Sequence, residues 1–303
     1  MTHNVLHSDP AIATANGIEI IYDMFGDLSA PPLLLIMGLN SQMIIWDEEF
    51  CVRLATKGYL VIRFDNRDVG LSTKFNEAGV PNIHALMQAQ AQGETVQIPY
   101  TLRDMADDAV GLLDALEIGS AHVIGASMGG MIGQMMAIHH PERLHTLTSM
   151  MSTAGDPVLP PLNQEAVSIL FTPVPTDRTE FIESFVQAWR VFNGPEFPVD
   201  EVRALECAEQ SFKRGVHPAG AARQLAAVIA SGNWKEALKS VTVPTLVIHG
   251  DADPLVPVKC GIDIADTIPG AKLLIIKGMG HALPPSVWPQ VIDAIALHAV
   301  DNK

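Results

Sequence analysis

A serine between glycines is the feature of this sequence that points most clearly to chemistry. Ser127 lies in Gly125-Ala126-Ser127-Met128-Gly129, a G-x-S-x-G pattern between an apolar run and a helical pattern. On a sharp strand-to-helix turn, such a serine presents its Oγ to a cleft, and the glycines let the two elements approach closely. The pattern predicts Ser127 as a nucleophile, whereas the alternative is a glycine-rich turn that only connects a strand to a helix.

A serine hydroxyl needs a general base to take its proton, and the base needs an acid to orient it. After a turn of this kind the order along the chain is Ser, then Asp or Glu, then His. Asp253 follows one apolar run and His281 follows the next. We predict Asp253 as the acid and His281 as the base, since the carboxyl ends of parallel strands are where α/β sheets place their ligands.

Asp251 competes with Asp253 for the role of the acid, because an Asp-rich turn before proline is also a common turn or helix cap. Asp253 is favoured because it lies further past the strand. Of the eleven histidines, His281 is the one in a late loop after a strand, whereas His122 and His249 fall in or beside predicted buried strands.

Acyl transfer also requires hydrogen-bond donors for the negative oxygen of the tetrahedral intermediate. The backbone N–H of Met128, directly after the predicted nucleophile, is the first candidate for this oxyanion hole. The second is expected in the loop after an early strand, where the N–H of Leu39 follows Gly38. The same loop also suits a plain connection in which Asn40 and Ser41 cap a helix.

The elements that must position these residues follow from apolar periodicity. Short apolar runs predict strands over 17–25, 33–37, 60–65, 121–124, 245–249 and 272–276. Helical patterns are predicted over 45–57, 102–116, 180–192, 200–213, 218–230 and 287–300, with another after Ser127 that ends before Pro141. This alternation predicts an α/β fold with a mostly parallel sheet flanked by helices.

Strand signals vanish from about Met151 to Lys239 and return afterwards. We therefore predict one interrupted α/β core, with residues 1–150 as its first part, 151–240 as an inserted helical cap and 241–303 as its second part. The candidate site residues come from both sides of the insertion, so core and cap together would form the functional unit.

Composition and charge limit the classes of binding partner that the sequence favours. The 303 residues include 19 Lys and Arg against 34 Asp and Glu, a formal net charge of −15, and 48% are hydrophobic, enough for a large core. With no cluster of basic residues, nucleic acid and an anionic membrane surface are disfavoured. Cys51, Cys207 and Cys260 are odd in number and lack C-x-x-C spacing, which predicts free thiols in a reducing compartment and no metal site.

The first ten residues have neither the basic nor the apolar region of a secretory signal, so we expect the cytoplasm. The stretch 118–140 carries no formal charge and is long enough for a membrane span, yet its glycines and polar residues divide it into a strand, a turn and a helix. We predict no membrane span, and a homo-oligomer stays open.

Taken together, these segments resemble the α/β-hydrolase superfamily and, more narrowly, the aclacinomycin methylesterase-like serine esterases. Residues 36–39, 63–72, 125–130, 243–254 and 278–284 carry the resemblance. It implies an α/β-hydrolase fold without a cofactor, the roles already assigned to Ser127, Asp253 and His281, and a cap over 151–239. Two dipeptides depart from the pattern, since many members have His-Gly and Arg-Gly where this chain has Met37-Gly38 and Arg67-Asp68.

The sequence thus predicts a carboxylic ester hydrolase that forms an acyl-enzyme on Ser127 and acts on small to medium, largely apolar or uncharged esters. Its 13 methionines, several of them near the predicted site, suit an adaptable apolar pocket, although core filling explains most of them. Two alternatives keep the same three residues: a C–C bond hydrolase or perhydrolase, and a ligand receptor or signalling protein with slow turnover. Dehalogenase and epoxide hydrolase chemistry is disfavoured, because those enzymes use an aspartate where this chain has Ser127.

Overall fold

A computed structural model of the chain describes residues 5–94, 96–156 and 163–302. Residues 1–4, in the segment where no secretory signal is predicted, lie outside this description. So do residue 95, residues 157–162 of the predicted cap and residue 303 of the predicted core.

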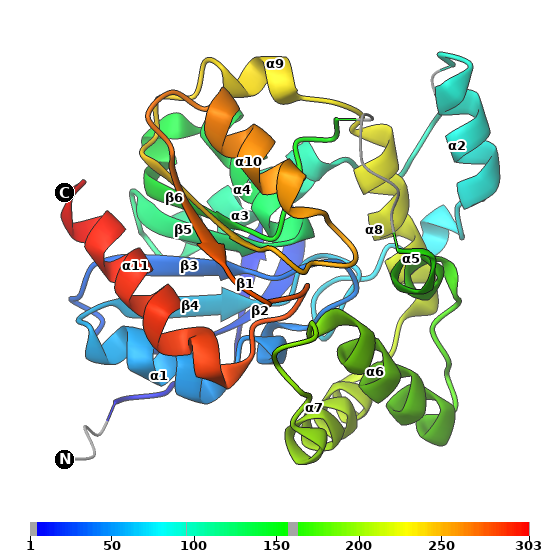
Figure 1. The fold of residues 1–303 in the computed structure, drawn as a ribbon, viewed down its shortest axis with the longest axis horizontal. Coiled ribbons are helices and arrows are strands. Elements are labelled where there is room, and N and C mark those ends of the chain that lie inside the picture. Colours follow the sequence, from blue (N-terminus) through cyan, green and yellow to red (C-terminus); the bar gives the residue numbers. More distant parts are fainter. Residues whose placement is uncertain (1–4, 95, 157–162, 303) are drawn as a thin grey trace.

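A single twisted sheet crosses the molecule (Figure 1). Within the described ranges its strands are β1 (Ala11–Ala15), β2 (Ile18–Phe25), β3 (Pro32–Ile36), β4 (Leu60–Phe64), β5 (Ala121–Ala126), β6 (Leu144–Met150), β7 (Thr245–Gly250) and β8 (Lys272–Ile276). Their order is β1-β2-β4-β3-β5-β6-β7-β8. β2 runs antiparallel to both β1 and β4, and every other pair is parallel. The carboxyl ends of β3, β5, β6, β7 and β8 therefore meet at one edge.

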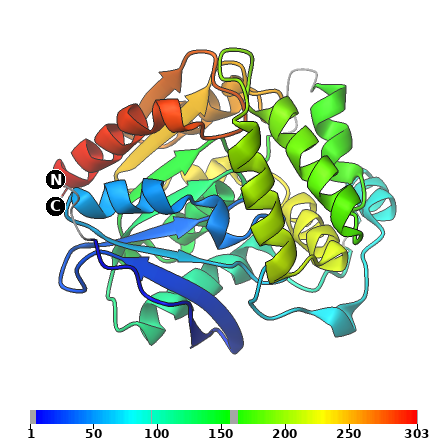
Figure 2. The same ribbon diagram turned by 90° about the horizontal axis from the view of Figure 1, so that it is seen from below.

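Helices cover both faces of the sheet, which explains why its central strands are buried apolar runs without alternation. On one face lie α3 (Leu102–Ala115), α4 (Met128–His139), the short α9 (Lys235–Leu238) and α10 (Val258–Thr267). On the other, α1 (Glu48–Thr56) and α11 (Trp288–Val300) lie side by side, as Figure 2 shows. The two apolar clusters on these faces form the core of the molecule.

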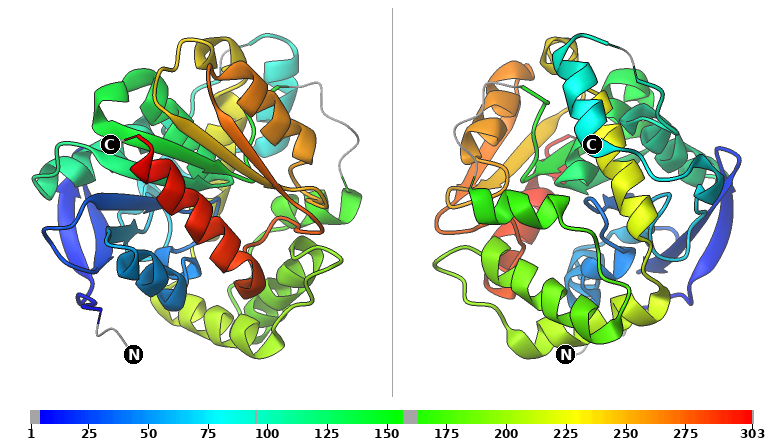
Figure 3. Two further views of the ribbon diagram at one scale, coloured as in Figure 1. Left: turned by 60° about the vertical axis from the view of Figure 1, so that its left-hand side comes forward. Right: turned by 90° about the vertical axis from the view of Figure 1, so that its right-hand side faces the viewer.

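A second group of helices covers the carboxyl edge of the sheet: α5 (Gln164–Phe171), α6 (Arg178–Phe192), α7 (Glu201–Arg214) and α8 (Pro218–Ala230). The right-hand view of Figure 3 faces this group, and α2 (Ile83–Ala91) packs beside α8 there. Short 3-10 turns occur at Met43–Ile45, Asn76–Ala78, Pro141–Arg143 and Pro285–Val287. We call α5 to α8 the cap helices; α2 joins them from a part of the chain that the sequence assigned to the core.

The mostly parallel sheet flanked by helices confirms the predicted fold class. The six predicted strands are present to within two residues, but β1, β6, α2, α5, α9 and α10 were not predicted. β6 was missed because its buried residues include Thr146, Thr148 and Ser149, which interrupt the apolar run. The predicted start of a helix at residue 45 was wrong: α1 begins at Glu48, because the Asp47 side chain accepts the Glu49 N–H and caps it.

None of the helices in the described residues is both long and apolar enough to cross a membrane. The uncharged stretch 118–140 forms β5, a turn and α4, as predicted. All three cysteines are free; Cys51 and Cys260 are buried, whereas Cys207 is only half-buried. Burial raises the pKa of the Cys260 thiol to about 11 and that of Cys207 to about 12, so both thiols stay protonated and unreactive at neutral pH.

Candidate active site

Ser127 lies on a strained turn between β5 and α4. Its backbone has φ 56° and ψ −119°, a conformation that residues other than glycine rarely adopt. The turn is held by two hydrogen bonds, from the Ser127 N–H to the Met150 carbonyl at 2.9 Å and from the Ser152 hydroxyl to the Ser127 carbonyl at 2.9 Å. Such strain persists only where the surroundings enforce it, and here they aim the Oγ into a cavity.

The two glycines of the pattern are required for close packing. A Cβ on Gly125 would lie 2.0 Å from the Gly129 carbonyl oxygen, and a Cβ on Gly129 would lie 2.1 Å from the Ile36 carbonyl oxygen. Both distances are far below van der Waals contact. A side chain at either position would therefore separate α4 from β5 or from β3 and displace the turn that carries Ser127.

His281 joins Ser127 to Asp253. Its Nε2 is 2.9 Å from the Ser127 Oγ, and its Nδ1 is 2.8 Å from Asp253 Oδ2. Because a carboxylate only accepts, Nδ1 carries the proton and Nε2 is free to accept the hydroxyl proton of the serine. The His281 side chain is 7% exposed and that of Asp253 is fully buried. The structure thus brings the three predicted side chains into one continuous chain of hydrogen bonds.

The two competing aspartates have different partners. Asp253 Oδ1 accepts the backbone N–H groups of Leu255 and Val256 at 2.9 and 2.8 Å, which leaves Oδ2 for His281. Asp251 Oδ1 accepts the Gly278 N–H at 2.6 Å. Asp251 therefore ties the turn after β7 to the loop that carries the histidine, and only Asp253 reaches the imidazole.

Asp253 is held in its ionised form. Burial alone would raise the pKa of its carboxyl, but the positive charge that His281 can carry and the hydrogen bonds from His249 and His281 lower that pKa well below the usual range. A carboxylate that stays charged can stabilise an imidazolium on His281 throughout the physiological range of pH.

His249 is a neighbour of Asp253 that the sequence placed only in a buried strand. Its Nε2 lies 2.8 Å from the Val256 carbonyl oxygen and 3.4 Å from Asp253 Oδ2. In the described part of the chain its Nδ1 is a buried polar atom without a hydrogen-bond partner. The ring therefore donates through Nε2 beside the carboxylate and braces the turn that holds Asp253.

The segments that carry the two predicted oxyanion donors meet beside Ser127. A Cβ on Gly38 would lie 3.2 Å from the Ser127 Cβ, so the loop after β3 passes directly beside the serine. Among the hydrogen bonds of the described residues, none uses the N–H of Leu39 or of Met128. The Asn40 N–H, in contrast, donates to Gln224 Oε1 at 2.8 Å. The two predicted donors are thus free to bind an oxyanion, whereas their neighbour Asn40 is occupied.

The loop 37–42 is attached to both core and cap, and we call it the oxyanion loop. Asn66 Nδ2 donates to the Met37 carbonyl at 2.9 Å from the core side. From the cap side, the Gln42 amide donates to the Ser211 carbonyl at 2.8 Å, and its oxygen accepts Arg214 Nε at 2.8 Å. The sequence predicted an oxyanion donor in this loop but not the contacts that Asn66, Ser211 and Arg214 make with it.

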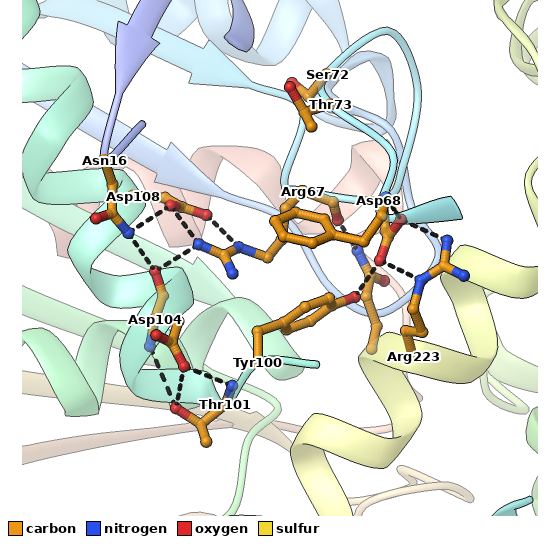
Figure 4. A network of polar contacts seen from close by, with 12 residues as sticks. Asn16, Arg67, Asp68, Ser72, Thr73, Tyr100, Thr101, Asp104, Asp108 and Arg223 are labelled. Atoms are coloured by element: carbon orange, nitrogen blue, oxygen red, sulfur yellow. Dashed lines mark hydrogen bonds and ion pairs between the residues drawn. The ribbon is translucent and has the colours of Figure 1, made fainter. Parts of the chain in front are cut away.

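A buried ionic network lies behind the oxyanion loop, where Arg67-Asp68 departs from the pattern of related families (Figure 4). Arg67 pairs with Asp108 at 2.6 Å, and Asp68 pairs with Arg223 of α8 through two hydrogen bonds of 2.7 Å. The Tyr100 hydroxyl donates to Asp68 at 2.7 Å. Burial would raise the pKa of the Asp68 carboxyl, but the hydrogen bonds from Arg223 and Tyr100 lower it below its usual value. Asp68 therefore joins the core to the cap as a charged side chain.

A cavity of about 1250 Å³ opens in front of Ser127 and His281, between the carboxyl edge of the sheet and the cap helices. Aromatic side chains from both parts line it, including Phe181, Phe185, Trp189 and Phe192 of α6 and Trp46 of the core. Among the methionines, Met37, Met150 and Met151 reach its wall, whereas Met131, Met135 and Met136 lie in the core. The site is thus a large, mainly apolar pocket with Ser127 and His281 in its wall.

The charged side chains that line the cavity are Asp47, Glu196, Asp200 and Arg203. Arg203 pairs with Asp47, which leaves two carboxylates on the wall. In the described residues, no group of three His, Cys, Asp or Glu side chains is placed to hold a metal ion.

Comparison with known proteins gives a consistent result. The family described as alpha/beta hydrolase fold matches residues 31–284. The rhodomycin D methylesterases DauP of Streptomyces sp. (strain C5) and DnrP of Streptomyces peucetius are 32% and 33% identical to this chain, over 94% of its length and 96% of theirs. The meta-cleavage product hydrolase CumD of Pseudomonas fluorescens IP01 superimposes with a TM-score of 0.73 over 97% of this chain and 98% of its own, at 19% identity. The predicted resemblance is thereby confirmed over most of the chain.

Proposed function

Because the chain belongs to the alpha/beta hydrolase fold family, we propose that it is a serine carboxylesterase whose nucleophile is Ser127. The observation that carries the proposal is the continuous hydrogen-bond chain from Ser127 through His281 to Asp253, at 2.9 and 2.8 Å. The serine end of this series of hydrogen bonds lies in the wall of a cavity large enough to hold an ester.

In the proposed reaction, Ser127 Oγ attacks the ester carbonyl carbon while His281 Nε2 takes the hydroxyl proton. The tetrahedral oxyanion is bound by the N–H groups of Met128 and Leu39, and Met128 also begins α4, whose positive dipole end favours negative charge. His281 then protonates the leaving alcohol, and an acyl-enzyme remains. Water activated by the same imidazole releases the acid, while Asp253 orients and stabilises the imidazolium.

We propose that the substrates are esters of small alcohols with bulky, largely uncharged acids. The relatives DauP and DnrP are named as methylesterases, which supports a small alcohol. The cavity of about 1250 Å³ is larger than the ~300–1,000 Å³ of ordinary ligand pockets, and this supports acids beyond the small to medium range expected from sequence. The wall carboxylates Glu196 and Asp200 disfavour an acid with a further negative charge.

In this proposal residues 1–150 and 241–303 form the core, and residues 151–240 form a cap that closes over the substrate. The lining of the cavity by α6, α8 and α2 supports a cap to which α2 also contributes. We expect the protein to act in the cytoplasm, as its sequence predicts.

Labelling with a phosphonate ester tests the nucleophile. Peptide mass spectrometry should find the label on Ser127, and methyl esters of graded acid size should be hydrolysed with kcat within the usual ~1–10³ s⁻¹. Ser127→Ala and His281→Ala should remove both labelling and turnover. A folded protein that is not labelled and hydrolyses no ester would exclude the proposal.

The same experiment separates the alternatives. Turnover of a ring-cleavage diketone without activity on p-nitrophenyl esters would identify a C–C bond hydrolase, and turnover that needs peroxide would identify a perhydrolase. A labelled Ser127 with kcat far below ~1 s⁻¹ on every ester would favour a ligand receptor.

A further inference from the structure

The side chain of Gln224 joins cap helix α8 to the oxyanion loop. It is fully buried, and both ends of its amide bind backbone atoms of the core. Oε1 accepts the Asn40 N–H at 2.8 Å, and Nε2 donates to the Arg67 carbonyl at 2.7 Å. Because a buried amide loses much of its stabilisation when one partner is missing, this geometry strongly favours one position of the loop relative to α8.

The position it favours is the one the proposed oxyanion donor needs. The Leu39 N–H belongs to the peptide between Gly38 and Leu39, and the peptides on either side are both anchored. The Met37 carbonyl is bound by Asn66 at 2.9 Å, and the Asn40 N–H is bound by Gln224. Asn40 itself has φ 55°, a conformation that costs energy without outside contacts. Removing the Gln224 contact would therefore release the loop's anchor one peptide away from the donor, while the contacts of Asn66 and Gln42 remain.

Helix α8 is itself fixed against the core, so Gln224 can hold the oxyanion loop in a defined position. A Cβ on Gly220 would lie 2.1 Å from the Asp68 carbonyl oxygen, so the helix backbone rests directly on the core. Arg223, adjacent to Gln224, forms the buried ion pair with Asp68, whose own φ is 70° (Figure 4). Helix α8 thus packs on the core at the dipeptide Arg67-Asp68, which departs from the pattern of related families.

Gln224 does not reach the substrate. Its neighbours Ala221, Ala222 and Leu225 line the cavity, but in the described residues Gln224 is not part of the wall. Any effect of this side chain on the reaction must therefore pass through its two hydrogen-bond partners, the Asn40 N–H of the oxyanion loop and the Arg67 carbonyl.

We propose that Gln224 is a positioning residue that holds the oxyanion loop for catalysis, so that the cap takes part in the stabilisation of the transition state as well as in binding. The inference rests on the proposed esterase function. It predicts an effect on kcat with little effect on KM, because the contact orients a donor for the tetrahedral oxyanion and touches no part of the bound ester.

The test compares Gln224→Met with Tyr100→Phe in the full-length protein. Both variants remove buried hydrogen bonds around Arg67 and Asp68, but in the part of the chain that the structure describes Tyr100 makes no hydrogen bond to the oxyanion loop. Loss of a direct oxyanion donor lowers kcat by about 10²–10³, so we expect a loss of about 10- to 100-fold from Gln224→Met and less than about threefold change in KM. Tyr100→Phe should keep kcat within about twofold.

An inhibitor pair adds a readout that a purely structural role would not move. A trifluoromethyl ketone adds to the serine and carries an oxyanion, whereas the alcohol of the same carbon skeleton only fills the cavity. In Gln224→Met the Ki of the ketone should rise in parallel with the loss of kcat, and the Ki of the alcohol should change by less than about threefold.

Hydrogen exchange in the wild-type protein supplies a test that needs no variant. The Asn40 amide should exchange slowly, because Gln224 occupies it in a buried position. Exchange at the rate of an exposed loop would overturn the inference.

The outcomes separate the two proposals. An active, labelled wild type with an equally active Gln224→Met, or a kcat loss without a matching change in the ketone Ki, would overturn the role of Gln224 alone. A wild type that is neither labelled nor active would overturn the esterase proposal, and this inference with it.

Discussion

The cap contacts the two sides of the candidate site in different ways. On the histidine side it uses backbone: the His281 N–H donates to the Phe192 carbonyl at 2.6 Å, and the Gly280 N–H donates to the Asn193 carbonyl at 3.2 Å. On the oxyanion side its backbone also contacts the core, at the Ser211 carbonyl and at Gly220, but long side chains are added, with Gln224 on Asn40 and Arg223 on Asp68.

The difference explains which substitutions each side can tolerate. Backbone contacts depend on how closely two chain segments approach, so they are sensitive to glycines and indifferent to most side chains. Side-chain contacts depend on the chemical identity of one residue, so a single substitution removes them. The histidine side should therefore fail when chain approach is blocked, and the oxyanion side when one buried polar group is lost.

The largest expected effect comes from Asp253→Asn, which changes a side chain whose hydrogen bonds, in the described residues, all go to residues of the core. An amide in this position stabilises the wrong tautomer of His281, so kcat should fall by about 10³–10⁴. Asp251→Asn is the matched control, since in the described residues the Asp251 carboxylate accepts the Gly278 N–H and makes no hydrogen bond to His281, and it should lower kcat by less than about tenfold. Steady-state kinetics on one methyl ester measures both. Full activity in Asp253→Asn with loss in Asp251→Asn would assign the acid to Asp251.

Arg223→Met breaks the side-chain contact of the oxyanion side. It leaves Asp68 buried and unpaired, which should lower the free energy of unfolding by about 3–5 kcal/mol. Arg190→Met removes an exposed pair with Glu201 and should cost less than about 1 kcal/mol. Urea unfolding followed by circular dichroism gives both values; equal costs would show that the buried pair does not fasten α8.

Gly194→Ala breaks the backbone contact of the histidine side. Gly194 has φ 90°, and a Cβ there would lie 2.5 Å from the Gly280 nitrogen. We expect a loss of about 1–3 kcal/mol in unfolding free energy together with a lower kcat, because the segment before His281 must shift. Gly270→Ala has a similar φ of 73° with open space around it, so it should carry only the backbone cost. Thermal unfolding and kinetics of the pair separate strain from displacement, and similar kcat values would argue against displacement.

Acid pH should lower the free energy of unfolding through one carboxylate on each side of the site, by less than the substitutions above. The pKa values of Asp253 and Asp68 are lowered in the folded protein from the usual 3.8. Their contribution to stability is therefore complete above about pH 4 and is lost as the pH falls toward the folded pKa values, by at most about 1.4 kcal/mol per pH unit for each group. Urea unfolding between pH 5 and pH 2 should show this decline, with a shallower slope in Asp68→Asn. An unchanged slope in that variant would mean that folding does not lower the pKa of Asp68.

The parts of the molecule that local patterns encode were predictable. The turn at Ser127 requires glycines at fixed positions, and the strands before Ser127, Asp253 and His281 are apolar runs. Because parallel strands end at one edge, the order of these residues along the chain was enough to place them together. The backbone contact at His281 also left a trace, since Gly278 and Gly280 flank that histidine.

No sequence pattern marks the cap contacts on the oxyanion side. Gln224 lies 184 positions from Asn40 along the chain, and a glutamine in a helical pattern is an ordinary surface residue until the fold buries it. Arg67-Asp68 was visible as a departure from the family pattern, but its partner Arg223 was not. The polar strand β6 was missed for a related reason, because its threonines are buried only by the neighbouring strands and helices.

By itself, the sequence determined the interrupted parallel sheet and placed Ser127, His281 and an aspartate turn at its edge, because apolar period and glycine spacing act over a few neighbouring residues. Only the tertiary structure decided which aspartate reaches His281, which N–H groups stay free beside Ser127 and which cap residues hold the oxyanion loop. Those outcomes depend on differences of a few tenths of an ångström in the distances between segments far apart in the chain, because a hydrogen bond forms only within a narrow range of distance and angle.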